Sequence, residues 1–372
     1  MNPQKVLVIG ANHHNTLSVI RALGINGVSS DLIIIGDEIG AISKSKYVQN
    51  TYLLDDAYSL LSFLDNPKLY NSIIFSCSDE VSSVLNDNLD KLRSFYHFFQ
   101  CPIQGQLTIL MDKFIQVQYA NNAGFKVPLS KKINNQDSYI FKSFPCILKP
   151  LASIKGGKSI YIIHNENDLA YNELVNKSGI DFLVQEKINI KYEIVLCGLS
   201  TPNKVIIPGY VKKHREVLGG TTYSSIYDIS TLPDNVVHCA KELVRSMEYE
   251  GLFGIECAYD GKDFIFIEIN LRNDATTYSL AVAGSNLIYA YYLDKMGLRY
   301  EHVVNNNIKK IKCMVEFKDF HKVLEGEVSL FKWIYQRKTA ECLYYYDEDD
   351  IAPYIAEKQR IIKKIRKKIL RF

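Results

Sequence analysis

The sequence lacks the features that mark several classes of protein. None of its apolar runs is long enough to cross a membrane, and the N-terminal "MNPQKVLVIG" lacks the charged region, apolar core and small-residue cleavage site of a leader. Hydrophobic residues make up 47% and charged residues 23% of the 372 residues, which excludes a disordered or fibrous chain. We therefore expect a globular, cytoplasmic protein of two or three domains.

Paired cysteines are also missing. The eight cysteines are scattered along the chain without a CxxC pair, and most have apolar neighbours. Buried free thiols in a reducing compartment explain this distribution better than a zinc site or a set of disulfides.

A strong charge of one sign is absent from most of the chain. The net charge is +3, but residues 358–372 hold eight Lys or Arg and no acid, which leaves the remaining residues at −5. The body therefore gives no indication of a nucleic-acid partner. In the tail, isoleucines recur at helical spacing between basic residues, which predicts a basic amphipathic helix over 351–372 that contacts the inner face of a membrane. A solvated terminal helix, or one docked on a neighbouring subunit, is the alternative.

The chain opens with three short β-rich runs, "KVLVIG", "DLIIIG" and "NSIIFS", which alternate with helical patterns near 15–24, 56–65 and 79–99. This order predicts an α/β domain with a Rossmann-like parallel sheet over residues 1–105. The turn "GANHHNT" lacks the later glycines of a dinucleotide-binding fingerprint, so dinucleotide binding there is rejected. A helix beginning at this turn would still suit an anionic group of a substrate. We interpret His13 and His14 as polar turn residues rather than metal ligands.

A different pattern begins at residue 106. It contains a helix over 112–123, paired strands "FPCILKP" and "SIYIIH" around the loop "LASIKGGK", a helix over 166–178 and the strand "DFLVQEKI". From residue 191 the pattern is that of an antiparallel sheet, with a helix over 234–249. Residues 305–350 are predicted to form a small mixed appendage, which carries Trp333.

The stretch "FIFIEINLRND", residues 264–274, begins as an apolar strand and then carries polar residues at alternate positions. On a strand, Glu268, Asn270 and Arg272 share one face. The opposite face is apolar and consists of Ile267, Ile269 and Leu271. A strand with one solvated face is the plainer interpretation of this alternation.

Glu256 lies on the preceding run "FGIECAY", across the turn "DGKD" from this strand. It stands opposite Glu268 if the turn is centred on Lys262, and a three-residue loop over 261–263 that contains a glycine meets this condition. Two facing carboxylates repel, so either one is protonated or a divalent cation binds both. Their hard oxygen ligands suit Mg²⁺ or Mn²⁺.

With this partner, "IEINLR" resembles the metal-binding signature E-x-N-x-R of the ATP-grasp superfamily. The interval between Glu256 and Glu268 is similar to that in biotin carboxylase and its relatives. The resemblance implies an ATP-grasp fold that binds ATP with Mg²⁺. It makes Glu256, Glu268 and Asn270 the metal ligands, and Arg272 a catalytic contact to phosphate or substrate.

Further matches to this family follow in the order it requires. Lysines that resemble the two ATP lysines stand on the helix before "AGFKVP" and in "FPCILKP", and the second, also catalytic, leads into a glycine loop. The run "FLVQEKINIKYEIVL" resembles the adenine hinge, followed by the acid that binds the ribose hydroxyls. The residues implied to bind ATP are, in this order, Lys113, Lys149, Gly156, Gly157, Glu186, Lys187, Ile188 and Glu193.

The segment "VKKHREVLGGTTYSS", residues 211–225, resembles the part of carboxylate–amine ligases of this superfamily that faces the acceptor site. By this resemblance Lys213 and Arg215 hold a substrate carboxylate, and Gly219 and Gly220 allow a close backbone approach. An exposed basic loop after a strand is the alternative.

The resemblance also implies a domain division and an activity. After the first domain come an ATP-grasp lid and nucleotide-binding subdomain over 106–190 and a catalytic subdomain over 191–304. The activity implied is an ATP-dependent ligase that activates a small-molecule carboxylate as an acyl phosphate and joins it to an amine, on a small metabolite, amino acid or sugar-linked acid. The basic tail would suit polysaccharide assembly at a membrane, and many relatives form homodimers. The alternatives are another ATP-grasp chemistry, such as carboxylation or carbamoyl phosphate formation, and a catalytically silent ATP-binding module.

Overall fold

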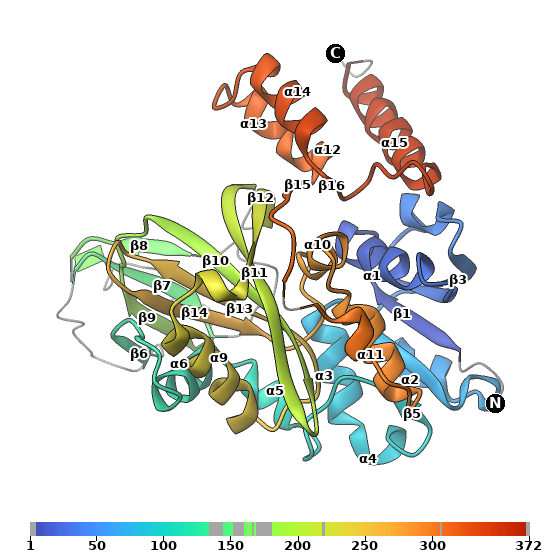
Figure 1. Cartoon of the computed structure of the whole chain (residues 1–372), viewed down its shortest axis with the longest axis horizontal. Helices are drawn as coiled ribbons and strands as arrows, with labels where there is room; N and C mark the ends of the chain where they lie inside the picture. The colour runs from blue at the N-terminus through green and yellow to red at the C-terminus, as the bar shows by residue number, and fades with distance from the viewer. Residues whose placement is uncertain are drawn as a thin grey trace.

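The computed structural model describes residues 5–133, 144–151, 160–165, 167–168, 181–217, 220–305 and 307–369. In this part of the chain the strands form three sheets, one parallel and two largely antiparallel, with helices packed against them (Figure 1). The arrangement confirms the predicted α/β class.

The N-terminal sheet is parallel, as predicted, with the strand order β3-β2-β1-β4-β5. Its strands are β1 (Val6–Gly10), β2 (Ser30–Ile35), β3 (Val48–Leu54), β4 (Ser72–Ser76) and β5 (Tyr96–His97). The helices of this part are α1 (His14–Gly24), η1 (Ala41–Lys44), α2 (Ser59–Leu64), η2 (Pro67–Leu69), α3 (Asp79–Asp87) and α4 (Leu89–Leu92). Strands β1 and β4 are buried along their whole length, which explains why they are continuous apolar runs.

The N-terminal part differs from its prediction in two places. The sequence pattern does not reveal β3, because this edge strand is mostly exposed or half-buried and mixes polar with apolar residues. The single helix predicted over 79–99 is wrong, since α3, α4 and β5 occupy that range. Helix α3 ends where Asn88 leaves the helical conformation, with φ −118° and ψ 25°.

The second sheet has four antiparallel strands in the order β6-β9-β7-β8. They are β6 (Ser130–Ile133), β7 (Cys146–Pro150), β8 (Tyr161–Ile163) and β9 (Phe182–Glu186). The pairing of β7 with β8 confirms the predicted strand pair around the glycine loop. The loop itself, with Gly156 and Gly157, and most of the helix predicted over 166–178 lie outside the described residues.

The third sheet has seven strands in the order β14-β13-β10-β11-β12-β15-β16. They are β10 (Tyr192–Thr201), β11 (Lys204–Val217), β12 (Gly220–Asp228), β13 (Gly251–Tyr259), β14 (Phe264–Asn270), β15 (Lys312–Met314) and β16 (Cys342–Leu343). Helices α5 (Gln106–Leu110) and α6 (Lys113–Asn122) precede the second sheet in the chain. The helices that follow or separate the strands of the third sheet are η3 (Ile229–Thr231), α9 (Asp234–Ser246), α10 (Thr277–Val282), α11 (Leu287–Lys295) and η4 (Glu301–Val303). All neighbouring strands pair antiparallel except β15 and β16, which confirms the antiparallel pattern predicted from residue 191.

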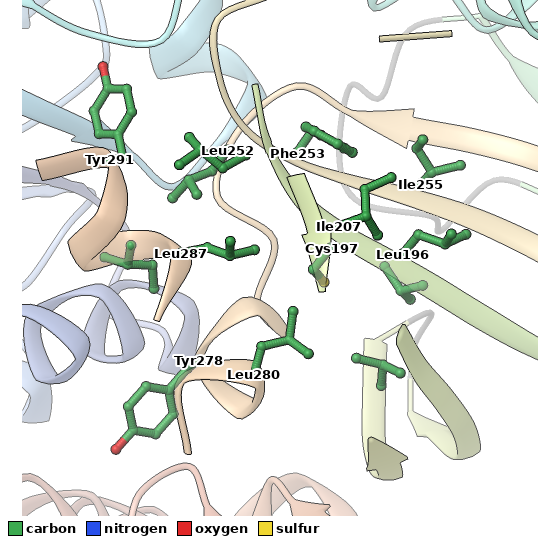
Figure 2. Close-up of a cluster of buried hydrophobic side chains, with 14 of the residues drawn as sticks. Leu196, Cys197, Ile207, Leu252, Phe253, Ile255, Tyr278, Leu280, Leu287 and Tyr291 are labelled. Carbon is green, nitrogen blue, oxygen red and sulfur yellow. The ribbon is translucent and has the colours of Figure 1, made fainter. Parts of the chain in front are cut away.

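One continuous apolar core joins the third sheet to the N-terminal domain. Figure 2 shows Leu252 of β13 near Leu287 and Tyr291 of α11, whereas Phe253 and Ile255 of the same strand lie further from that helix, and all five belong to one core. Helix α1 contacts both α10 and α11, so these helices form a layer between the two sheets. Burial at this scale holds the parallel sheet and the third sheet together as one packed unit.

The β13–β14 hairpin places Glu256 opposite Glu268, as predicted, but through a different turn. Tyr259 pairs with Phe264, so the connection has four residues rather than three. A β-bulge at Ile267 adds one residue to β14 and restores the pairing of the two glutamates. Ile267 is therefore half-buried, and Phe266 enters the core in its place.

The C-terminal part contacts both the third sheet and the N-terminal domain. Strands β15 and β16 extend the third sheet next to β12. The helices of this part are α12 (Glu316–Asp319), α13 (His321–Leu324), α14 (Leu330–Thr339) and α15 (Ala352–Ile369). Helix α15 packs on η1 of the N-terminal domain. Just before α15, Asp350 accepts a hydrogen bond from Arg21 Nε at 2.9 Å, and both side chains are fully buried.

The structure tests the predictions made for the cysteines and for the C-terminal tail. All eight cysteines are free and buried, as predicted. Helix α15 confirms the helix predicted in the tail. No helix in the described part of the chain combines the length and the apolar character needed to cross a bilayer.

Candidate functional site

Four charged side chains meet on one face of the third sheet. Val195 of β10 pairs with Glu256 on one side and with Val211 on the other. Because side chains two residues apart share a face, Glu193 and Lys213 lie on the same face as Glu256. Glu268 joins them from β14, directly opposite Glu256.

Lys113 neutralises Glu268 from the start of α6. Its Nζ lies 2.8 Å from Oε2 of Glu268. Asp112 caps α6 by accepting hydrogen bonds from the backbone N–H groups of Phe114 and Ile115, which fixes where the helix begins. Gln116 then clamps α6 to β14, since its side chain both donates to the carbonyl of Ile269 and accepts from the N–H of Ile269. The predicted helix α6 therefore begins at a position from which Lys113 reaches the carboxylate of Glu268.

Lys213 is the centre of an acidic cluster. Its Nζ lies 2.8 Å from Glu193, 2.9 Å from Glu216 and 2.6 Å from Glu256. Burial by itself would lower the pKa of Lys213, but the three carboxylates outweigh burial and raise the pKa well above its usual value. The ammonium is therefore charged, and it compensates the acids in this arrangement.

Lys149 is a second buried lysine near the same carboxylates, on β7 of the second sheet. Burial, helped by the neighbouring charge of Lys113, lowers its pKa to about 8, while Glu268 and Glu256 act in the opposite direction. Any additional negative charge that approaches Lys149 would stabilise its protonated form.

The acids and the amide predicted to bind a metal form a donor set that suits a hard divalent cation. Burial raises the pKa of Glu256 to about 7, although Lys213 acts against burial. Burial acts in the same direction on Glu268, but Lys113 outweighs it and lowers the pKa of that carboxyl. Asn270 Oδ1 accepts a hydrogen bond from Arg272 at 3.1 Å. These oxygens fit Mg²⁺ or Mn²⁺, and a cation shared by both glutamates would relieve the burial cost on Glu256.

Asp274, another carboxylate near this set, already forms hydrogen bonds within the protein. Among the described residues, no group of three or more His, Cys, Asp or Glu side chains is arranged to hold a metal. Asp274 caps the following turn by accepting from both the N–H and the hydroxyl of Thr276. It packs against Gly254, where an added Cβ would lie 2.9 Å from the Cβ of Asp274, so a larger residue there would displace Asp274. The metal role of Glu256, Glu268 and Asn270 stays a prediction.

Arg272 lies beyond the end of β14 rather than on it, so the predicted alternation ends at Asn270. Its Nε donates to Asp79 Oδ1 at 2.8 Å, and Asp79 begins α3 of the N-terminal domain. Burial would lower the pKa of Arg272, but Asp79 and its other acidic neighbours outweigh burial and raise it. The sequence pattern does not identify Asp79, because this contact joins residues 193 positions apart.

The predicted adenine hinge borders a cavity of about 530 Å³ at the end of β9. Glu186, Lys187 and Ile188 line it together with residues of α6 and the β13–β14 turn. Glu186 is paired with Leu129, whose N–H it accepts at 3.1 Å, and the Lys187 N–H donates to the carbonyl of Pro145. None of the charged residues on the sheet face lines this cavity, so the cavity and the charged cluster are separate features of the described structure.

The segment predicted to face an acceptor is a long hairpin formed by β11 and β12, not an exposed loop. Arg215 forms a two-point ion pair with the buried Asp319, through Nε at 2.9 Å and Nη2 at 2.6 Å. Its Nη1 donates to Gln336. Gly220 begins β12, while Gly219 lies outside the described residues. Lys213 and Arg215 hold carboxylates of the protein in this structure, and their role at a substrate stays a prediction.

Part of this chain matches a known protein family in sequence. The family model described as the ATP-grasp domain matches residues 118–283. This chain carries an ATP-grasp domain. The match runs from within α6 to the end of α10 and therefore includes the second sheet and strands β10 to β14 of the third sheet, with Lys149, Lys213 and the two glutamates.

Two curated proteins illustrate what this chain is similar to in sequence. It is 27% identical over 197 residues to the carbamoyl phosphate synthase large chain of Clostridium acetobutylicum, a match that covers 50% of this chain and 18% of that protein. It is 22% identical over 350 residues to the formate-dependent phosphoribosylglycinamide formyltransferase of Francisella tularensis, covering 87% of this chain and 83% of that one. The chain thus spans less than a fifth of the first relative and most of the second.

Solved structures show the same ATP-grasp fold at low identity. An N5-carboxyaminoimidazole ribonucleotide synthetase in complex with ADP superposes with a TM-score of 0.69 at 12% identity, covering 88% of this chain and 86% of that one. An L-amino acid ligase from Bacillus licheniformis superposes with a TM-score of 0.63 at 12% identity, covering 84% and 80%. Both coverages extend beyond the family match, so the likeness includes parts of the chain outside residues 118–283.

Proposed function

We propose that this ATP-grasp protein is an ATP- and Mg²⁺-dependent ligase that activates a carboxylate as an acyl phosphate and joins it to an amine. The observation that carries the proposal is the charged face of the third sheet, where Glu256 and Glu268 stand opposite each other beside Lys113 and Lys149. Acids for a divalent cation and lysines for phosphates are the two components that phosphoryl transfer requires.

Each component has a role in the proposed reaction. Glu256, Glu268 and Asn270 would hold Mg²⁺, which offsets the charge of the ATP phosphates. Lys113 and Lys149 would bind phosphate oxygens, and the lowered pKa of Lys149 favours an anionic ligand there. Glu193, on the same face, would bind the ribose hydroxyls, and residues at the end of β9 would bind adenine.

The reaction proceeds in two steps. A carboxylate oxygen of the acid substrate attacks the γ-phosphorus of ATP, and ADP leaves with the bond to the bridging oxygen. The amine then attacks the carbonyl carbon of the acyl phosphate, loses a proton and expels inorganic phosphate to give the amide. Arg272 donates hydrogen bonds to Asp79 and Asn270, and in this proposal it would stabilise the charge on the transferring group.

The comparisons support this chemistry at the level of the family. The formyltransferase is formate-dependent by name and so uses a carboxylate, and the L-amino acid ligase joins amino acids by name. A small acid and a small amine are therefore the substrate classes proposed for this chain. The alternative of a catalytically silent ATP-binding module predicts a disrupted acid pair, whereas Glu256 and Glu268 are both present and directly paired.

The test is release of ADP and phosphate from ATP and Mg²⁺ in the presence of pools of amino acids and sugar acids, each with and without amines. The proposal expects release that requires both an acid and an amine and that disappears in Glu268→Gln. The matched control is Glu216→Gln, which removes an acid that pairs with Lys213 but no proposed metal ligand. ATP binding without turnover on any pool would favour the silent module instead.

A further inference from the structure

Helix α14, in the C-terminal part of the chain, presents an apolar face to solvent. Its exposed apolar side chains are Leu330, Phe331, Ile334 and Tyr335, and their spacing of three and four residues places them on one side of the helix. Phe331 is 87% exposed and Tyr335 64% exposed, and no residue of α14 is buried. Single exposed apolar residues are common, but a contiguous set on one helix face marks a surface that binds a partner.

The opposite side of α14 holds the helix on the protein. Trp333 packs edge-on against Phe320, with ring centres 5.1 Å apart. Gln336 accepts a hydrogen bond from Nη1 of Arg215 at 2.9 Å. These contacts fix the rotation of α14 about its own axis, so its apolar face is directed away from the third sheet.

The basic helix α15 lies at the same end of the molecule, at the top of Figure 1. Arg337 of α14 lies over the ring of Tyr354 on α15, 5.8 Å from its centre, so the two helices are in contact. Ile355 and Ile362 of α15 are exposed and, seven residues apart, share one side of that helix. The exposed basic residues around them are Lys358, Lys363, Lys364 and Arg366. Apolar and positively charged side chains therefore occur together at this end of the molecule.

Charge indicates what covers the apolar face. Residues 358–372 hold eight Lys or Arg and no acid, and Lys332 and Lys338 of α14 are exposed as well. Two acids of the nearby chain, Glu325 and Glu327, are paired with Lys322 and so offset little of this charge. A two-fold contact with a second copy of the chain would bring these positive charges against each other. An anionic lipid surface instead attracts the basic residues and accepts apolar and aromatic side chains between its headgroups.

We propose that α14 and α15 together dock the protein on an anionic membrane surface. The apolar face of α14, with Phe331, Ile334 and Tyr335, enters the headgroup region, and the basic residues of α15 contact lipid phosphates. A single weak signal gives only marginal membrane binding, so the apolar face and the positive charge are both required. The proposal assigns a role to residues 305–350, and it does not depend on the ligase activity.

The first test is flotation of the full chain with vesicles of phosphatidylcholine and phosphatidylserine, compared with vesicles of phosphatidylcholine alone. The proposal expects binding at low salt only where phosphatidylserine is present. The double variant Phe331→Gln/Ile334→Gln should partition at least ~10-fold more weakly, because it removes two apolar side chains from the lipid contact. Glutamine preserves the helix propensity of α14, and the positive charge is unchanged.

The matched control is Tyr58→Gln, which removes an exposed aromatic residue of the N-terminal domain and should float as the parent does. The second test uses Trp333, which is the only tryptophan of the chain and lies on α14. Phosphatidylserine with brominated acyl chains quenches a tryptophan that lies at the lipid surface. The proposal expects quenching of Trp333 in the parent and much less quenching in the double variant.

Three results would overturn the proposal. Flotation without quenching of Trp333 shows that the basic tail binds lipid by itself. Equal flotation of the parent and the double variant shows that α14 stays in water. A parent that does not float, and whose dimer in sedimentation experiments is lost in the double variant, has a second copy on this face. The melting temperature of each variant is expected to be unchanged, because the replaced side chains are exposed, so loss of binding is distinguishable from loss of folding.

Discussion

Replacing Lys213 with methionine tests whether this ammonium balances the acidic cluster. The substitution keeps the length of the side chain but leaves Glu193, Glu216 and Glu256 without their shared cation. Breaking a buried ion pair by removing one partner typically costs ~3–5 kcal/mol, because the remaining charge stays desolvated. The Lys213 side chain is 7% exposed and meets three acids, so we expect a loss in this range in the absence of divalent cations.

The loss of stability in Lys213→Met should increase as the pH rises. The pKa of Glu256 is already raised to about 7, above the ordinary value of 4.5, so its contribution to stability is present at low pH and is lost as the pH rises through 7. Without Lys213 this pKa rises further. The destabilisation of Lys213→Met should therefore be small near pH 5, where Glu256 is protonated with or without Lys213, and should grow as the pH rises above about 7.

Magnesium should restore part of the lost stability, since a cation between Glu256 and Glu268 takes over the compensation. A ligand at about 100 times its dissociation constant adds ~2.7 kcal/mol. Urea unfolding at pH 5 and pH 8, with and without Mg²⁺, measures all of these effects. The control is Lys212→Met, whose ammonium lies 3.5 Å from the centre of the Tyr192 ring and whose loss should cost ~1 kcal/mol at most. A Lys213→Met protein as stable as the parent at pH 8 without Mg²⁺ would refute the reasoning.

Three further predictions follow from other parts of the molecule. ATP affinity should fall as the pH rises above about 8, because Lys149 then loses its proton, and Lys149→Arg should remove most of this dependence in calorimetric titrations at pH 7 and pH 9.5. Asp350→Ala should destabilise the chain by ~3–5 kcal/mol in urea unfolding, since it leaves the fully buried Arg21 unpaired; a loss below ~1 kcal/mol would contradict this. Deleting residues 358–372 should abolish flotation with phosphatidylserine vesicles at low salt, and flotation that survives the deletion or is unaffected by high salt would contradict a basic membrane-binding tail.

Local features of the sequence were sufficient for several elements of the fold. The apolar runs of β1 and β4 predict buried parallel strands, because both faces of such strands are covered. Asp112 marks the start of α6, since its side chain caps that helix. The pairing of Glu256 with Glu268 also follows from a short hairpin, although the predicted three-residue turn is wrong and the bulge at Ile267 compensates for it.

Exposed or mixed segments were harder to predict. Strand β3 does not alternate clearly, because an edge strand packs only part of its surface. The prediction of a helix over 79–99 did not allow for Asn88, where α3 ends. An asparagine side chain can compete with the backbone for hydrogen bonds and so end a helix. For β3 the deciding interactions lie outside the short window in which sequence periodicity is visible, whereas at Asn88 the deciding interaction is local, a hydrogen bond from its side chain to the carbonyl of Val84.

Tertiary structure alone decided the partners of the charged residues. Sequence spacing marks Lys213 as one of several basic residues on a strand, whereas the sheet register places it among three acids. Arg272 finds Asp79 across 193 positions and His13 meets Lys318 across 305, distances over which no local pattern carries information. The sequence by itself determined the buried strands, such as β1 and β4, and which acids stand opposite each other, because turns and hydrophobic periodicity act over a few residues. Which lysine or arginine neutralises which acid depends on burial and on long-range packing, and these exist only once the sheets have come together.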